Sequence, residues 1–75
     1  MGSLLARPTW PPRTRELNRY RRSRGLTAAV VAERLGLARS TISGYELSRA
    51  YCTERQFARI LTAIDELAAE LEAAR

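Results

Sequence analysis

The chain has 75 residues, a net charge of +5, no histidine and one cysteine, which excludes an internal disulfide framework and leaves a zinc site without its usual ligands. No apolar run approaches the ~20 residues that span a bilayer, and Leu4–Ala6 is too short for the apolar region of a signal peptide. We therefore expect one small cytoplasmic domain without a metal ion, a cofactor or a membrane contact.

The charge is distributed unevenly along the chain. Residues 1–64 carry 12 arginines against 4 glutamates, a balance of +8, whereas residues 65–75 carry one arginine against 4 acidic residues, a balance of −3. A basic body of this size suits a polyanion such as DNA. The alternative is that these arginines only solvate the surface.

Three prolines interrupt the first twelve residues. Pro8, Pro11 and Pro12 exclude a regular helix and predict an extended arm over residues 1–12. One hypothesis is that the arm follows DNA and inserts arginines into the minor groove. The alternative is a leader without a binding role, or Trp10 folding back onto the small core. The arginines in or next to the arm are Arg7, Arg13 and Arg15.

A first helix is predicted over residues 14–24. Thr14 can cap it after the proline pair, and Gly25 ends it. Leu17 and Tyr20 share its inward face because they are three residues apart.

Residues 26–49 predict two short helices around a tight turn. Thr27 can cap the first helix, and Gly36 can take the left-handed conformation that closes it. The second helix, over residues 39–46, presents mostly small and polar side chains. A helix, a glycine turn and such a second helix predict a helix-turn-helix unit, whose second helix enters the DNA major groove.

A long last helix is predicted from Thr53, which opens the capping-box sequence Thr-Glu-Arg-Gln, to residue 74, about 33 Å at ~1.5 Å per residue. Its apolar residues recur at steps of three and four. Those expected to pack on the motif helices are Phe57, Ile60, Leu61 and Ile64. A seam against a second chain is expected at Ile64, Leu67 and Leu71. The alternative for this end is a frayed amphipathic tail.

These elements predict an all-α fold, a small bundle of four helices that contains a helix-turn-helix, with a long C-terminal helix and an extended N-terminal arm. The expected divisions are the arm (1–12), the helix-turn-helix domain (13–64) and a C-terminal extension of the last helix (65–75).

The run G-L-T-x-x-x-V-A-E-R-L-G-L-x-R-S-T-I-S-x-Y-E, from Gly25 to Glu46, resembles the phage-repressor/Cro type of helix-turn-helix protein. Three positions depart from that pattern. Ala28 stands where the family often has glutamine, Ala38 where a capping Ser or Thr is usual, and Leu47–Ser48 where a residue followed by glycine is common. The resemblance implies that Arg21 forms an ion pair with Glu46.

The solvent-facing side of the second motif helix carries the candidate base-reading residues. Arg39 can donate two parallel hydrogen bonds to guanine, the commonest specific contact. The alternative for Arg39 is a phosphate contact that reads no sequence. The full candidate set is Arg39, Ser40, Ser43 and Gly44.

Phosphate contacts are expected around this helix. The resemblance suggests Arg49, and a helix N-terminus such as the one at Thr27 favours anions. The full set of candidates is Thr27, Tyr45, Arg49, Arg22 and Arg24.

These features together predict a sequence-specific transcriptional regulator that binds an inverted-repeat operator on double-stranded DNA as a homodimer, in a bacterial cell. No segment suggests a domain for a small-molecule ligand, so we expect a Cro-like repressor of a phage or mobile element; the alternative is the DNA-binding part of a larger repressor. A second hypothesis is an antitoxin that binds a toxin and its own operator. An enzyme is not expected, because the carboxylates are scattered and Cys52 belongs to no motif.

Overall fold

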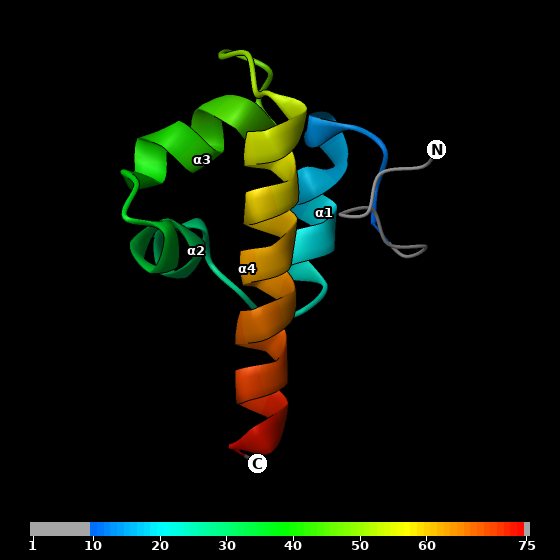
Figure 1. The fold of residues 1–75 in the computed structure, drawn as a ribbon, viewed down its shortest axis with the longest axis vertical. Helices are drawn as coiled ribbons and strands as arrows, with labels where there is room; N and C mark the ends of the chain where they lie inside the picture. The colour runs from blue at the N-terminus through cyan, green and yellow to red at the C-terminus, as the bar shows by residue number, and fades with distance from the viewer. Residues whose placement is uncertain (1–9, 75) are drawn as a thin grey trace.

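The computed structural model describes residues 10–74, which form an all-helical bundle without a β-strand. A short 3-10 helix, η1 (Thr14–Glu16), leads into α1 (Leu17–Arg22), and α2 (Ala28–Leu35), α3 (Arg39–Glu46) and α4 (Glu54–Ala73) follow. In Figure 1, α4 lies nearer the viewer than α1, with α2 and α3 to its left. The predicted four-helix fold with a long last helix is confirmed. Arg7 and the rest of residues 1–9 lie outside the described residues.

The first predicted helix differs from expectation at both ends. Thr14 does not cap it, because it lies inside η1, and Arg13 occupies the cap position without a side-chain bond. The backbone N–H of Glu16 bonds to the carbonyl of Arg13 at 3.0 Å, a tighter turn than an α-helix. At the other end, α1 gives way to turns before Gly25, whose φ of 74° only glycine adopts readily.

The last helix begins where the sequence predicts. The Thr53 hydroxyl accepts a hydrogen bond from the backbone N–H of Gln56 at 3.1 Å, and α4 then continues for 20 residues, about 30 Å. The second half of the capping box differs, since the Gln56 side-chain oxygen accepts from Arg59 Nη1 at 2.9 Å. Within the described residues, no helix is both long enough and apolar enough to cross a membrane.

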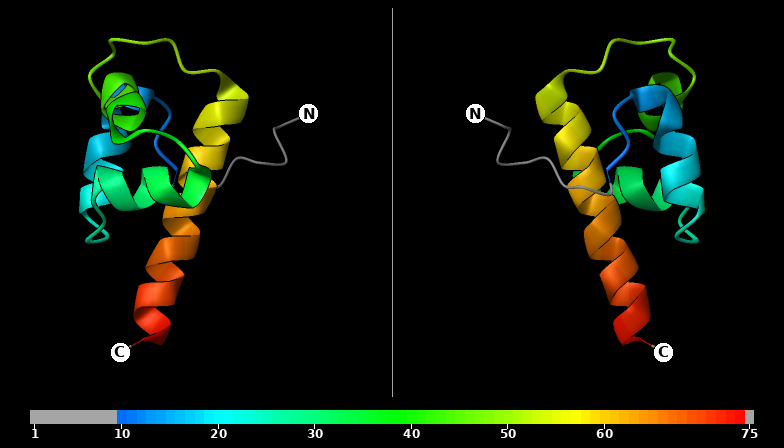
Figure 2. Two further views of the ribbon diagram at one scale, coloured as in Figure 1. Left: turned by 90° about the vertical axis from the view of Figure 1, so that its left-hand side faces the viewer. Right: turned by 90° about the vertical axis from the view of Figure 1, so that its right-hand side faces the viewer.

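The core lies where α1, α2 and α3 meet the middle of α4 (Figure 2). Ile64 is fully buried in this core, so it is not available to a seam with a second chain; its prediction as a seam residue is wrong. Leu67 is half-buried against the same cluster, whereas Leu71 is 44% exposed. The buried apolar residues of the cluster are Leu17, Tyr20, Leu26, Val31, Ala32, Ile42, Ile60, Leu61, Ala63 and Ile64.

Asp65 on α4 is hydrogen-bonded to two residues near the start of the described chain. Its carboxylate accepts hydrogen bonds from Trp10 Nε1 at 2.8 Å and from the Tyr20 hydroxyl at 2.6 Å. Trp10 also packs against the core. The structure therefore shows Trp10 folded back onto the core, which was one of the alternatives for the arm.

We expect Asp65→Ala to lower the free energy of unfolding by about 2 kcal/mol, because hydrogen bonds to a charged acceptor each contribute ~1.5–3 kcal/mol. Urea unfolding measures the change. Glu72→Ala, at an exposed position of the same helix, is the matched control and should stay within about 0.5 kcal/mol of the wild type. Equal stabilities for the two variants would contradict the role of Asp65.

Candidate nucleic-acid interface

The turn between α2 and α3 has the geometry that the sequence predicts. Thr27 caps α2 by accepting a hydrogen bond from the backbone N–H of Val30 at 3.2 Å. Gly36 ends α2 in the left-handed conformation, with φ of 70°. The N–H of Leu37 then bonds back to the carbonyl of Ala32 at 2.9 Å, which closes the helix end. These local bonds direct the chain into α3.

The first turn of α3 is open to solvent. Arg39 and Ser40 are exposed, and Ala38 at the cap position makes no side-chain hydrogen bond to the helix. The first N–H groups of a helix carry partial positive charge and favour an anionic neighbour. The start of α3 therefore presents a cationic side chain, a hydroxyl and backbone donors on one surface.

The rest of α3 is less exposed than the sequence suggests. Ser43 and Gly44 are half-buried. A Cβ placed on Gly44 would lie 3.8 Å from the Cβ of Ala50, so this position borders the loop after α3. In that loop, Ser48 has a φ of 58°, a left-handed conformation that glycine adopts more readily. Within α3, only the first two residues, Arg39 and Ser40, are exposed.

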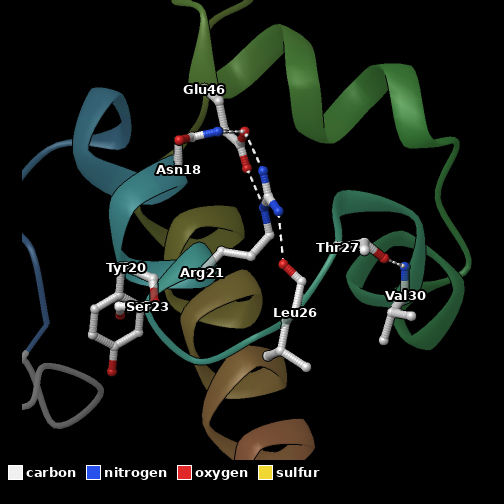
Figure 3. Close-up of polar contacts among 8 residues, drawn as sticks. All are labelled: Asn18, Tyr20, Arg21, Ser23, Leu26, Thr27, Val30 and Glu46. Carbon is white, nitrogen blue, oxygen red and sulfur yellow. Dashed lines mark hydrogen bonds and ion pairs between the residues drawn. The ribbon is translucent and has the colours of Figure 1, made fainter.

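A buried ion pair holds the end of α3 against α1 (Figure 3). Arg21 donates from Nε to Glu46 Oε2 at 2.8 Å and from Nη2 to Oε1 at 3.0 Å. Its Nη1 donates to the Leu26 carbonyl at 2.7 Å, and Asn18 donates to Glu46 at 3.0 Å. The structure thus brings together the two residues that the resemblance paired, and it adds Asn18 and the Leu26 carbonyl.

Two opposing effects act on the pKa of Glu46. Burial of the carboxyl group raises it, whereas the hydrogen bonds from Arg21 and Asn18 and the nearby positive charges of Arg21 and Arg22 lower it. The net result is a pKa below the ordinary value. The carboxylate is therefore ionised whenever the domain is folded at neutral pH.

The candidate phosphate ligands fall into two groups. Arg22 and Arg49 are exposed, and Thr27 keeps its O–H available for donation while its oxygen caps α2. Tyr45, in contrast, is half-buried against the core. Arg13 and Arg15, predicted for the minor-groove arm, are both exposed, Arg13 at the cap of η1 and Arg15 within it.

The contacts of Arg24 within the chain compete with its predicted role as a phosphate ligand. Its guanidinium lies 3.7 Å from the centre of the Tyr20 ring and donates to the Tyr20 carbonyl at 3.2 Å. It is also 4.0 Å from the carboxylate of Asp65. Because these three contacts engage the part-exposed guanidinium within its own chain, Arg24 is left out of the phosphate set proposed below.

Sequence reasoning missed the contacts of Arg34 and Asp65. Arg34 on α2 forms ion pairs with Glu66 and Glu70 of α4, which are 58% and 59% exposed. The i, i+4 spacing of the two glutamates could have indicated a shared cationic partner. No local signal identifies that partner as Arg34, because it lies more than thirty residues away in the sequence.

We expect Arg21→Ala to lower the free energy of unfolding by about 3–5 kcal/mol, because it leaves the buried Glu46 carboxylate without its main partner. Arg34→Ala is the matched control and should cost much less, since the partners of Arg34 are exposed and screened by water. Thermal unfolding at neutral pH measures both. If Arg21→Ala and Arg34→Ala had similar melting temperatures, burial of the Arg21–Glu46 pair would have no energetic consequence.

Stability should also depend on the ionisation of Glu46. Because its pKa is lower in the folded chain than the ordinary 4.5, this residue stabilises the fold above pH 4.5, and the stabilisation is lost as pH falls through the depressed value. The stability difference between wild type and Glu46→Gln should therefore shrink below pH 4.5. Urea unfolding from pH 7 to pH 3 tests this, with Glu72→Gln as a control for removing one exposed carboxylate.

Comparison with known proteins agrees with this geometry. A family model described as "Helix-turn-helix domain" matches residues 14–74. Searches of curated proteins and of solved structures found no match. The match includes η1, all four α-helices and the capped turn between α2 and α3. The chain therefore belongs to the helix-turn-helix domain family of DNA-binding proteins.

Proposed function

We propose that the chain is a sequence-specific transcriptional regulator, a Cro-like repressor of a phage or mobile element in a bacterial cell. It binds an inverted-repeat operator as a homodimer, with one α3 in the major groove of each half-site and half-site centres about one helical turn, ~34 Å, apart. Repression follows from occlusion of the promoter by the bound dimer.

The observation that carries this proposal is the asymmetry of α3. Its opening turn exposes Arg39 and Ser40, while Ile42 and Glu46 further along the helix are buried. A recognition helix needs this arrangement, because one face must be held rigidly while the N-terminal residues contact base edges. Arg39 is the base-reading residue in this proposal, and Ser40 and Ser43 contribute weaker contacts.

In this proposal, the phosphate contacts come from the end of α3 remote from Arg39 and from the start of α2. Arg49 lies in the loop three residues after α3 ends, and Arg22 lies near Glu46, at the other end of α3 from Arg39. Thr27 adds a hydroxyl and the N–H groups that open α2. Such contacts fix the orientation of the domain on the duplex without reading sequence.

Selection from random duplexes of about 25 base pairs, long enough for two half-sites, tests the proposal at near-physiological salt. We expect an inverted repeat. Arg39→Ala should weaken binding by about 1–3 kcal/mol and relax the preference at one position of each half-site. Arg49→Ala is the matched control and should weaken binding to all sequences and lower the salt slope by about one unit.

Salt-sensitive binding without enrichment of any sequence would overturn the proposal. The arginines would then contact phosphates only, and a protein partner, such as the toxin of the antitoxin hypothesis, would become the better explanation for the domain.

A further inference from the structure

The outward face of α4 carries four charges in a symmetric order. Arg55, Arg59, Glu66 and Glu70 are all exposed, at successive spacings of four, seven and four residues. These spacings place them along one face of the helix. Arg59 and Glu66 are equally distant in sequence from the midpoint between residues 62 and 63. The same is true of Arg55 and Glu70. The stripe is therefore basic in one half and acidic in the other.

This order opposes the dipole of the helix. The N-terminus of a helix favours acidic residues and its C-terminus favours basic ones. Glu54 follows that rule, but Arg55 also lies in the first turn, and Glu70 and Glu72 lie near the last, where α4 has no basic residue. An antiparallel neighbouring helix would correct the mismatch, because it places its own N-terminus beside the acidic end.

An apolar hollow of about 320 Å³ lies beside this stripe, between α2 and α4. Small and aliphatic side chains, including Leu35, Ala58 and Ala63, form its floor, and charged residues of the stripe form part of its rim. Small side chains at the midpoint allow a second helix to approach closely. Apolar contact at the centre and opposite charges at the ends thus lie on one surface, where Arg34 of the same chain already pairs with the exposed Glu66 and Glu70.

We propose that this face of α4 is the dimer surface, and that its occupant is α4 of a second copy of the chain, running antiparallel. Residues equidistant from the midpoint then face each other, so that Arg55 meets Glu70 and Arg59 meets Glu66 of the partner subunit. A two-fold axis produces each of these contacts twice. The inference rests on the homodimer of the proposed function and specifies its surface.

The arrangement of the helices allows both subunits of such a dimer to contact one DNA duplex. In Figure 1, α3 lies to the left of the upper part of α4, and the side views of Figure 2 show that α1 lies behind α4 as seen in Figure 1. If the partner's α4 packs on the viewer's side of α4, the two helices are related by an axis that runs from left to right in the view of Figure 1. Rotation about that axis keeps the partner's α3 on the left, so both recognition helices face the same side.

Sedimentation equilibrium without DNA tests the surface. Arg55→Glu with Arg59→Glu makes the stripe acidic throughout, and we expect the dimer dissociation constant to rise at least about tenfold, or 1.4 kcal/mol. Neither arginine has an ion pair with an acidic residue of its own chain among the described residues, so folding should be retained, and circular dichroism verifies it.

Complementation sharpens the test. Glu66→Arg with Glu70→Arg makes the stripe basic throughout, and an equimolar mixture of the two double variants should form a heterodimer. Because both glutamates also pair with Arg34, circular dichroism verifies the fold of this variant too. Val30→Ala with Leu71→Ala, which alters exposed apolar residues of α2 and α4 outside the stripe, is the control and should dimerise as the wild type does.

A monomeric wild type at about 100 µM, well above a micromolar dissociation constant, would overturn the inference. So would a dimer that survives the Arg55/Arg59 reversal, or one that is lost only in the Val30/Leu71 control. Selection of an inverted repeat by the wild type is independent of these results. Recovery of a repeat together with a charge-insensitive dimer would refute the surface alone, whereas a charge-sensitive dimer without a selected sequence would refute the regulator alone.

Discussion

The position of α3 depends on one buried guanidinium. Arg21 projects from α1 and bonds both to Glu46 at the end of α3 and to the backbone of Leu26 before α2. A carboxylate at the C-terminal end of a helix is disfavoured by the helix dipole. The bidentate contact with Arg21 offsets that cost and, because both groups are planar, also fixes a direction. Apolar packing of Ile42 holds α3 on the core, and the ion pair holds its C-terminal end against α1.

The sequence predicted those features whose causes are local. The Thr27 and Thr53 caps and the left-handed Gly36 each require only a few neighbouring residues, and each lies where the pattern places it. The predicted fold class follows from them, since short caps and turns separate four periodic segments. Exposure of Arg39 likewise follows from its place in the first turn of a short helix.

The features that the sequence did not predict depend on distances between segments of the chain, which the periodicity of apolar residues does not reveal. A repeat of apolar residues shows that Ile64 and Leu71 share a face, but it does not show how far the body of the domain extends along that face. The body covers Ile64 fully and leaves Leu71 partly exposed. The ion pair of Arg24 with Asp65 likewise joins residues more than forty positions apart.

The uneven charge of the chain has a structural interpretation that composition alone does not provide. Carboxylates of the acidic last segment contact Arg24 and Arg34 of the body. The arginines of the proposed DNA surface, Arg39 and Arg49, are exposed on α3 and the loop after it. Internal neutralisation at one end of the molecule therefore leaves positive charge concentrated near the other end, where a polyanion is proposed to bind.

The conformation of Ser48 has a consequence for motion. A non-glycine residue at φ of 58° costs on the order of 1 kcal/mol, and the turn that contains it is closed by backbone bonds to the carbonyls of Gly44 and Tyr45. Opening of this turn releases strain, whereas displacement of α3 breaks a buried ion pair. Fluctuations should therefore be confined to the loop, where Tyr51 is 86% exposed. The loop can then open locally while the helix beside it stays in place.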